Sequence, residues 1–188
     1  MTLDQLALKY GTDKSSQYHG YTRHYERFFE PIRKTVKNVM EIGVLGGASV
    51  KMWRDYFPAA TIHGVDIDKA SRKYAEKRIK ITIGDQADPG FLESLKPVWS
   101  KCDIVIDDGG HKMSQQFISM AVILPRMKPG AYYVIEDLQT SYNPIYQDGE
   151  PTTVEALKRL IDMVEDNQNT WWVDSMFFAK GLCVIKKQ

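Results

Sequence analysis

The sequence contains little cysteine, and neither of its two cysteines belongs to a motif. Cys102 and Cys183 each lie in or beside an apolar run, and no Cys-x-x-Cys pair occurs. This scarcity excludes a disulfide framework and a zinc site built from cysteine pairs. We therefore expect two reduced thiols in the core of a cytoplasmic protein.

Excess charge and long apolar segments are also absent. The chain has 25 Lys and Arg against 24 Asp and Glu, a formal net charge of +1. Such a balance gives no reason to expect a nucleic-acid or membrane partner. No apolar run approaches the length of a membrane span, and residues 1–11 lack the apolar core of a signal peptide. We expect residues 1–188 to form a single domain.

Within that domain, apolar runs typical of strands alternate with helical segments. Strands are expected at 39–42, 61–65, 79–83, 103–106 and 131–135. Helices are expected at 48–56, 69–77, 89–95, 114–124 and 154–164. Residues 171–178 and 182–185 resemble an antiparallel hairpin turning at Lys180-Gly181. The alternation predicts an α/β fold: a doubly wound, mostly parallel, Rossmann-like sheet of seven strands within residues 36–188.

Two of the predicted strands end in paired carboxylates. The first ends in Asp107 and Asp108, which Gly109-Gly110-His111 follow; the second ends in Glu136 and Asp137. Residues just past the ends of parallel strands gather in one crevice. Carboxylates suit a hard cation such as Mg²⁺, and a nearby histidine suits a general base. Helix capping is the alternative interpretation, since Asp and Gly are common where strands turn into helices.

A glycine-rich loop joins the first strand to its helix. It reads Glu41-Ile42-Gly43-Val44-Leu45-Gly46-Gly47-Ala48-Ser49. Leu45 stands where the second glycine of Gly-x-Gly-x-x-Gly would be, so the dinucleotide fingerprint is incomplete. No Walker lysine follows, which argues against a phosphate cradle. The loop is either a plain tight turn or the floor of a ligand site.

The next two strands favour a ligand site. Asp66 ends the second strand about twenty residues beyond the glycines, as expected for a carboxylate that binds ribose hydroxyls. Asp68 could instead cap the following helix, which makes Asp66 the better ribose ligand. The third strand ends in Asp85 and Gln86, either of which could hydrogen-bond an adenine amino group.

Residues 1–35 are expected to form a helical segment that contributes a lid. Residues 3–10 have a helical pattern, and 25–29 are again amphipathic. Between them, the aperiodic stretch 11–25 is either a surface connection or a lid over the crevice. We expect a lid, because the stretch concentrates side chains that bind polar ligands: Thr12, Asp13, Lys14, His19, Tyr21 and Thr22.

Together these motifs resemble the class I S-adenosylmethionine-dependent O-methyltransferases. They most resemble the metal-dependent enzymes that methylate macrolide and rhamnosyl sugars. The resemblance includes Lys9-Tyr10-Gly11-Thr12-Asp13-Lys14 and His19-Gly20-Tyr21-Thr22 and extends over nearly the whole chain. The family often has Ser where this chain has Gly110, and some members carry an additional large N-terminal domain.

The resemblance implies a role for each site residue. Gly43 and Gly46 would line the methionine part of S-adenosylmethionine, with Glu41 near its amino group. Gly47 and Ser49 would also bind the cofactor. Asp66 would hold the ribose, and Asp85 or Gln86 the adenine. Thr12, Tyr21 and Asp107 would complete the cofactor site. Mg²⁺ would be bound by Asp108, Glu136 and Asp137, with His111 and Asp108 as the catalytic residues.

The implied reaction transfers a methyl group from the sulfonium to a sugar hydroxyl. Metal binding lowers the pKa of the hydroxyl, and His111 would accept its proton. Tyr21, Tyr142 and Tyr146 could form the wall of a water-poor pocket. A glycoside or sugar is the expected partner, and a homo-oligomer is not excluded. Two alternatives remain: a metal-dependent hydroxylase or hydrolase-like relative, and a non-catalytic module that binds S-adenosylmethionine.

Overall fold

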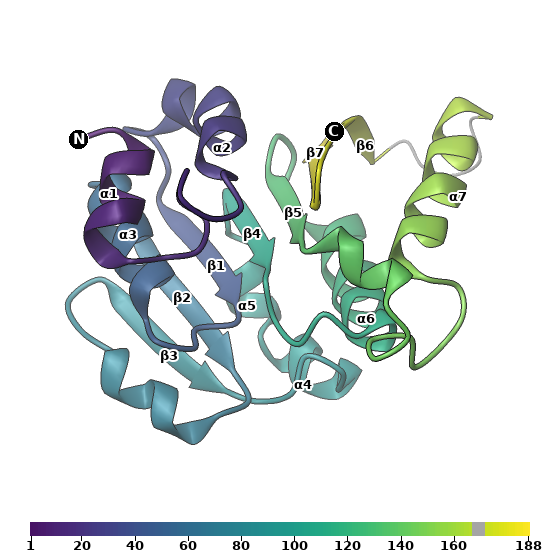
Figure 1. Cartoon of the computed structure of the whole chain (residues 1–188), viewed down its shortest axis with the longest axis horizontal. Coiled ribbons are helices and arrows are strands. Elements are labelled where there is room, and N and C mark those ends of the chain that lie inside the picture. Colours follow the sequence, from purple (N-terminus) through teal and green to yellow (C-terminus); the bar gives the residue numbers. More distant parts are fainter. Residues whose placement is uncertain (167–171) are drawn as a thin grey trace.

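The computed structural model describes residues 1–166 and 172–188, and its framework is one seven-stranded sheet (Figure 1). The strands lie in the order β3-β2-β1-β4-β5-β7-β6. Strands β1 to β5 are parallel, whereas β7 runs antiparallel to both β5 and β6. Their bounds are β1 Asn38–Ile42, β2 Thr61–Asp66, β3 Ile79–Ile83, β4 Ile104–Asp107, β5 Tyr132–Glu136, β6 Val173–Ala179 and β7 Leu182–Lys187. The predicted α/β sheet with a C-terminal hairpin is confirmed, except that Trp171 lies outside the described residues.

The helices form two layers, one on each face of the sheet. The α-helices are α1 Leu3–Tyr10, α2 Thr22–Phe29, α3 Ala48–Tyr56, α4 Pro89–Ser94, α5 Lys96–Trp99, α6 Met113–Ile123 and α7 Thr153–Glu165. Helices α1 to α3 share one hydrophobic core with alternate side chains of the strands, such as Val39 and Ile106. Helices α4 to α7 pack on the opposite face, against the intervening side chains such as Met40 and Val105. No helix in the described part of the chain is long and apolar enough to cross a membrane.

Short 3₁₀ helices account for most differences from the predicted elements. They are η1 Glu30–Ile32, η2 Lys69–Tyr74, η3 Leu124–Arg126 and η4 Leu138–Tyr142. The helix predicted at 69–77 is shorter and of the 3₁₀ type: it begins after the Asp68 cap and ends at Tyr74, and Glu76 then pairs with Ile79. Helix α5 has a single turn and was not predicted, because four residues are too few to show a period.

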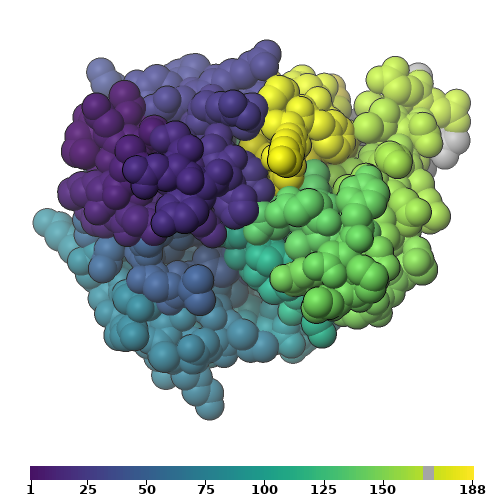
Figure 2. Space-filling view, viewed as in Figure 1, coloured from purple at the N-terminus to yellow at the C-terminus, as the bar shows by residue number. Residues whose placement is uncertain are grey.

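The N-terminal residues pack beside the C-terminal strands. The Tyr21 hydroxyl donates a hydrogen bond to the carbonyl of Gly181, in the turn between β6 and β7, at 3.2 Å. In the space-filling view the dark purple N-terminal segment adjoins the yellow C-terminal strands (Figure 2). The chain between α1 and α2 therefore lies close to the carboxyl end of β5, where the predicted acidic residues are found.

Candidate active site

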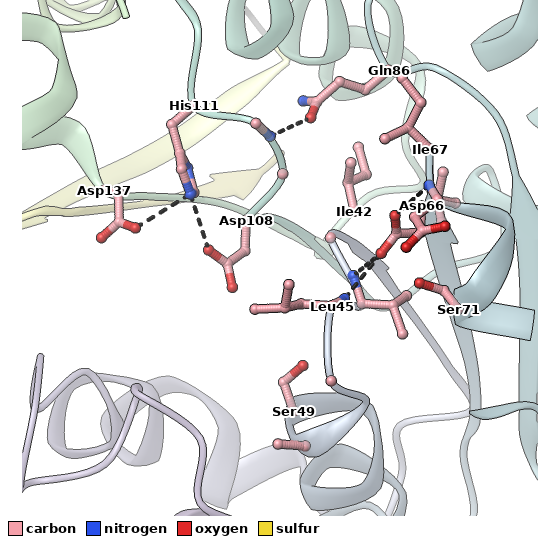
Figure 3. A pocket seen from close by; sticks show the side chains of 18 of the residues that line it. Ile42, Leu45, Ser49, Asp66, Ile67, Ser71, Gln86, Asp108, His111 and Asp137 are labelled. Atoms are coloured by element: carbon pink, nitrogen blue, oxygen red, sulfur yellow. Dashed lines mark hydrogen bonds and ion pairs between the residues drawn. The ribbon is translucent and has the colours of Figure 1, made fainter. Parts of the chain in front are cut away.

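A cavity of about 590 Å³ opens at the carboxyl ends of the parallel strands. This size is typical of small-molecule sites, and the cavity lies at the switch point of the sheet, between β1 and β4. Its two ends are chemically different (Figure 3): His111, Asp108 and Asp137 lie at one end, and Asp66, Ile67 and Ser71 at the other. The lining also includes Gly11, Thr12, Asp13, Lys14, Gly43, Leu45, Gly46, Ser49, Asp85, Gln86 and Gln115.

The glycine-rich loop lets two strand ends approach closely. Gly43 has a φ of +95°, and a Cβ placed on it would lie 1.9 Å from the carbonyl oxygen of Asp108. Gly47 has a φ of +74° and packs against the Tyr74 ring, so its role is to start α3 rather than to line the cavity. Gly43 and Gly46, by contrast, expose backbone directly to the cavity.

Asp66 both fastens this loop and faces the cavity. One carboxylate oxygen accepts the backbone N–H groups of Val44 and Leu45, each at 2.9 Å, and the other accepts that of Asp68 at 2.8 Å. Burial raises the pKa of Asp66, but these hydrogen bonds outweigh burial and hold the pKa below its usual value. A carboxylate has about four acceptor positions, so the ionised group can still accept a ligand hydroxyl.

Asp85 and Gln86 have different surroundings although they are neighbours. One oxygen of Asp85 accepts the N–H of Ala87 at 2.8 Å, and Asp85 lines the cavity. Gln86 also lines the cavity but is 6% exposed, and both ends of its amide are engaged. Its Oε1 accepts the N–H of Gly110 at 3.0 Å and its Nε2 donates to Asp107 at 3.0 Å. Gln86 therefore supports the loop that carries His111, and Asp85 is the freer of the two.

Glutamine side chains pack closely against the two glycines before His111. A Cβ on Gly109 would lie 1.8 Å from Oε1 of Gln86, and one on Gly110 would lie 2.3 Å from Oε1 of Gln115. Beneath the loop, Asp107 is fully buried, and burial raises its pKa. Its carboxylate accepts hydrogen bonds from Ser119 and Gln86 rather than facing the cavity.

Asp108, His111 and Asp137 form the acidic end of the cavity. One ligand atom from each lies within 4.8 Å of the others. Nε2 of His111 lies 3.4 Å from Oδ2 of Asp137 and 3.9 Å from Oδ1 of Asp108. The backbones of His111 and Asp137 both adopt left-handed conformations, with φ of 57° and 56°. A left-handed backbone is strained in residues other than glycine, and such strain is common at functional sites.

In Asp137, one oxygen is held by two hydrogen bonds and the other faces His111. Its Oδ1 accepts hydrogen bonds from the Tyr21 hydroxyl at 2.7 Å and from Gln139 at 2.9 Å. Burial raises the pKa of Asp137, but these hydrogen bonds outweigh it and hold the pKa below its usual value. Tyr21 is buried behind this carboxylate and does not line the cavity, so it contacts a proposed metal ligand rather than the proposed cofactor site.

Glu136 lies apart from this group and faces Lys14. Its Oε2 accepts a hydrogen bond from Nζ of Lys14 at 2.9 Å, and Tyr25 donates to its Oε1. The side chains of Glu136 and Asp137 diverge because Glu136 ends the strand, whereas Asp137 turns into the left-handed conformation. Burial and the nearby Asp108 raise the pKa of Glu136 well above its usual value. As a metal ligand, Glu136 remains a prediction.

Glu41 is another buried acid, and the family resemblance implies that it lies next to the cofactor. Its carboxylate accepts hydrogen bonds from Ser49 at 2.7 Å and from Trp53 at 3.0 Å, and lies 3.7 Å from Nζ of Lys14. Burial raises the pKa of Glu41 to about 7. Glu41 does not line the cavity, but it positions Ser49 and Lys14, which do.

The residues at the two ends of the cavity fit a hard cation and a nucleotide-like cofactor. Oδ1 of Asp108 and Oδ2 of Asp137 both lie near Nε2 of His111, and oxygen ligands are those that Mg²⁺ prefers. Nδ1 of His111 is buried without a hydrogen-bond partner in the described chain, so no hydrogen bond through Nδ1 fixes the ring. At the other end, Asp66 and Asp85 offer acceptors beside exposed backbone.

Sequence reasoning missed the apolar side chains at the cofactor end. Leu45 is 89% exposed and Ile67 is 67% exposed, yet both line the cavity. Two exposed aliphatic side chains beside Asp66 offer a surface for a flat aromatic base. No periodicity could identify them, because both lie in loops. Of the aromatic residues expected to wall the site, Tyr146 lies with its ring centroid 6.3 Å from that of His111.

Comparison with known proteins shows relatives of one kind. No protein-family model matches the chain. Over 168 residues it is 42% identical to the 8-demethyl-8-alpha-L-rhamnosyl tetracenomycin-C 2'-O-methyltransferase of Streptomyces olivaceus, covering 84% of this chain and 44% of that protein. It is 37% identical over 179 residues to the mycinamicin VI 2''-O-methyltransferase of Micromonospora griseorubida, covering 88% and 45%.

Solved structures extend this similarity to the fold. The MycE methyltransferase, in complex with Mg, SAH and mycinamycin VI, aligns with a TM-score of 0.91 and 34% identity. The alignment covers 100% of this chain and 54% of that one. The chain thus spans about half the length of the relatives it matches. In sequence and in fold it is similar to the sugar O-methyltransferases, and the resemblance seen in its motifs is confirmed.

Proposed function

We propose that the protein is an O-methyltransferase that uses S-adenosylmethionine and Mg²⁺ to methylate a hydroxyl of a sugar or glycosylated natural product. The observation that carries this proposal is the convergence of Asp108, Asp137 and His111 at one end of the cavity. The nucleotide-suited residues Asp66 and Asp85 lie at the other end. This arrangement would place a methyl donor and an activated hydroxyl in the same enclosed space.

Two aspartates would hold the cation, each through the oxygen that faces His111. These are Oδ1 of Asp108 and Oδ2 of Asp137, with Glu136 as the third ligand that the resemblance implies. When bound, Mg²⁺ supplies a Lewis acid that lowers the pKa of a coordinated hydroxyl. His111 lies beside both aspartates and would accept the proton of the hydroxyl through Nε2. Gln86 holds the loop that sets the position of His111.

The remaining site residues would bind and orient the methyl donor. Gly43, Gly46 and Ser49 border the part of the cavity nearest to α3, where the methionine moiety would lie. Asp66 would accept hydrogen bonds from the ribose, and Asp85 would accept one from the adenine amino group. Leu45 and Ile67 would cover the base, because burying apolar surface stabilises such a contact. Orientation of the two reactants contributes several kcal/mol to methyl transfer.

The MycE structure supports a glycoside acceptor, since it contains mycinamycin VI as well as SAH and Mg. The relatives named above are O-methyltransferases of a rhamnosyl tetracenomycin and of mycinamicin VI. The cytoplasmic location, the absence of nucleic-acid and membrane partners, and the oligomeric state remain predictions. So do the organisation of residues 1–188 as one methyltransferase domain and the role of the 11–25 stretch as a lid.

Product analysis tests the proposal against its alternatives. The protein is incubated with Mg²⁺, labelled S-adenosylmethionine and a panel of rhamnosides and other glycosides. The proposal predicts label in a sugar ether, together with S-adenosylhomocysteine. A hydroxylated or hydrolysed product formed without S-adenosylmethionine would instead identify a hydroxylase or hydrolase. Tight cofactor binding with no product from any acceptor would favour a binding module.

A further inference from the structure

Lys14 is a buried cation at the centre of the acidic residues, and the proposed function assigns it no task. Its side chain is 1% exposed, although it comes from the aperiodic chain between α1 and α2. Nζ donates hydrogen bonds to Oδ2 of Asp108 and, at 2.9 Å, to Oε2 of Glu136. It also lies 3.7 Å from Oε1 of Glu41. One ammonium therefore contacts an acid from the end of each of three strands, β1, β4 and β5.

These contacts place Lys14 in competition with any cation at the site. The Asp108 carboxylate faces His111 with one oxygen and Lys14 with the other. A buried lysine is costly unless its charge is paired, and these acids provide the pairing. The same acids would attract a divalent cation, which a positive charge on a shared carboxylate repels.

We propose that Lys14 is a built-in competitor of the divalent cation and lowers the affinity of the site for it. Lys14 holds Asp108 and Glu136 when the cation is absent, which keeps the acidic residues together without a metal. When the cation binds, Lys14 gives up part of this pairing. The inference rests on the metal-dependent function proposed above and concerns only this chain's own residues.

The test measures Mg²⁺ binding directly, without turnover. Isothermal titration with Mg²⁺ alone is carried out on the wild type and on Lys14→Met, at about pH 8 so that the acids can release their protons. The inference predicts that Lys14→Met binds Mg²⁺ at least about tenfold more tightly. It also predicts a larger rise in melting temperature on Mg²⁺ addition, because the cation then replaces the missing ammonium.

Lys9→Met is the matched control. Lys9 is on the same N-terminal segment, but its ion pair with Asp55, at 3.3 Å, is on the surface and its side chain is 48% exposed. Its removal should leave Mg²⁺ affinity unchanged. If Lys14→Met does not fold, Glu136→Gln is compared with the double variant Lys14→Met/Glu136→Gln, which removes the ammonium and one acid together. The double variant should then bind Mg²⁺ more tightly than Glu136→Gln.

The possible results distinguish a failure of this inference from a failure of the proposed function. Equal or weaker Mg²⁺ binding after removal of Lys14, with clear binding by the wild type, overturns the inference alone. Absence of Mg²⁺ binding from every variant overturns both the inference and the metal-dependent part of the proposed function.

Discussion

Nε2 of His111 lies 3.4 Å from Oδ2 of Asp137, although the two residues follow different strands. The other oxygen of Asp137 is held by Tyr21 and Gln139, so the carboxylate cannot turn away from the histidine without losing two hydrogen bonds. In the proposed reaction, this pairing would fix the side of the cavity on which the proton is transferred.

Replacing His111 should affect the rate rather than cofactor binding. His111→Ala removes the proposed base, and general-base catalysis typically contributes about 10²- to 10⁴-fold. We expect kcat to fall by this factor while the Kd for S-adenosylhomocysteine stays near the wild-type value. Steady-state kinetics and calorimetry on the same preparation measure both quantities. A variant with near-normal kcat at saturating Mg²⁺ and acceptor would show that the proton leaves by another route.

Replacing Asp66 should weaken cofactor binding. Asp66→Ala removes the proposed ribose acceptor and three hydrogen bonds to the loop backbone. Loss of charge-assisted hydrogen bonds costs about 1.5–3 kcal/mol, or roughly 10- to 100-fold in Kd. Asp68→Ala is the control, because Asp68 caps the 69–74 helix through Ala70 and should affect Kd less. The ribose assignment fails if calorimetry finds the larger loss in the control.

Substitutions of Asp85 and Gln86 should change different quantities, the cofactor Kd for Asp85 and kcat for Gln86. Gln86→Leu removes the contacts to Gly110 and Asp107, which displaces the His111 loop. Small displacements of a catalytic group can cost about 10²-fold, so kcat should fall while cofactor Kd changes little. Asp85→Ala should raise the Kd about tenfold by removing an adenine contact and should leave kcat nearly unchanged. The reverse pattern would make Gln86 the residue that recognises the base.

Glu41 should make the unliganded protein less stable as the pH rises. Its pKa is raised by burial from 4.5 to about 7, so its contribution to stability is complete below pH 4.5 and is lost as the pH rises through about 7. This change corresponds to about 3 kcal/mol. Relative to Glu41→Gln, the wild type should lose about that much unfolding free energy between about pH 5 and about pH 8. Urea unfolding of both proteins measures the difference, and a constant difference across this range would refute the assignment.

The sheet could be predicted because its pattern is local. Buried parallel strands give continuous apolar runs, and each run such as Ile104 to Ile106 is followed by residues that favour turns. The order of the acids along the chain likewise placed Asp108 and Asp137 at the same edge. The separate directions of Glu136 and Asp137 could not be predicted, because they depend on a single backbone angle just after β5.

Lys14 shows a second limit of sequence reasoning. The sequence identifies Lys14 as a polar residue of the predicted lid. Its burial depends on contacts with Glu41, Asp108 and Glu136, which are far from it in the sequence. An aperiodic segment gives no indication of which side chain points inward. The same applies to Gln86, whose amide is engaged only because the Gly109-Gly110 turn passes beside it.

The most direct test is methyl transfer before and after removal of the metal. The protein is treated exhaustively with EDTA, and transfer of labelled methyl from S-adenosylmethionine to an accepted glycoside is measured. Mg²⁺ is then restored, and Asp137→Asn is measured in parallel. We expect transfer to be lost on chelation, to return with Mg²⁺ in the wild type, and to stay strongly reduced in Asp137→Asn. Undiminished transfer after chelation would show that the reaction does not need a metal.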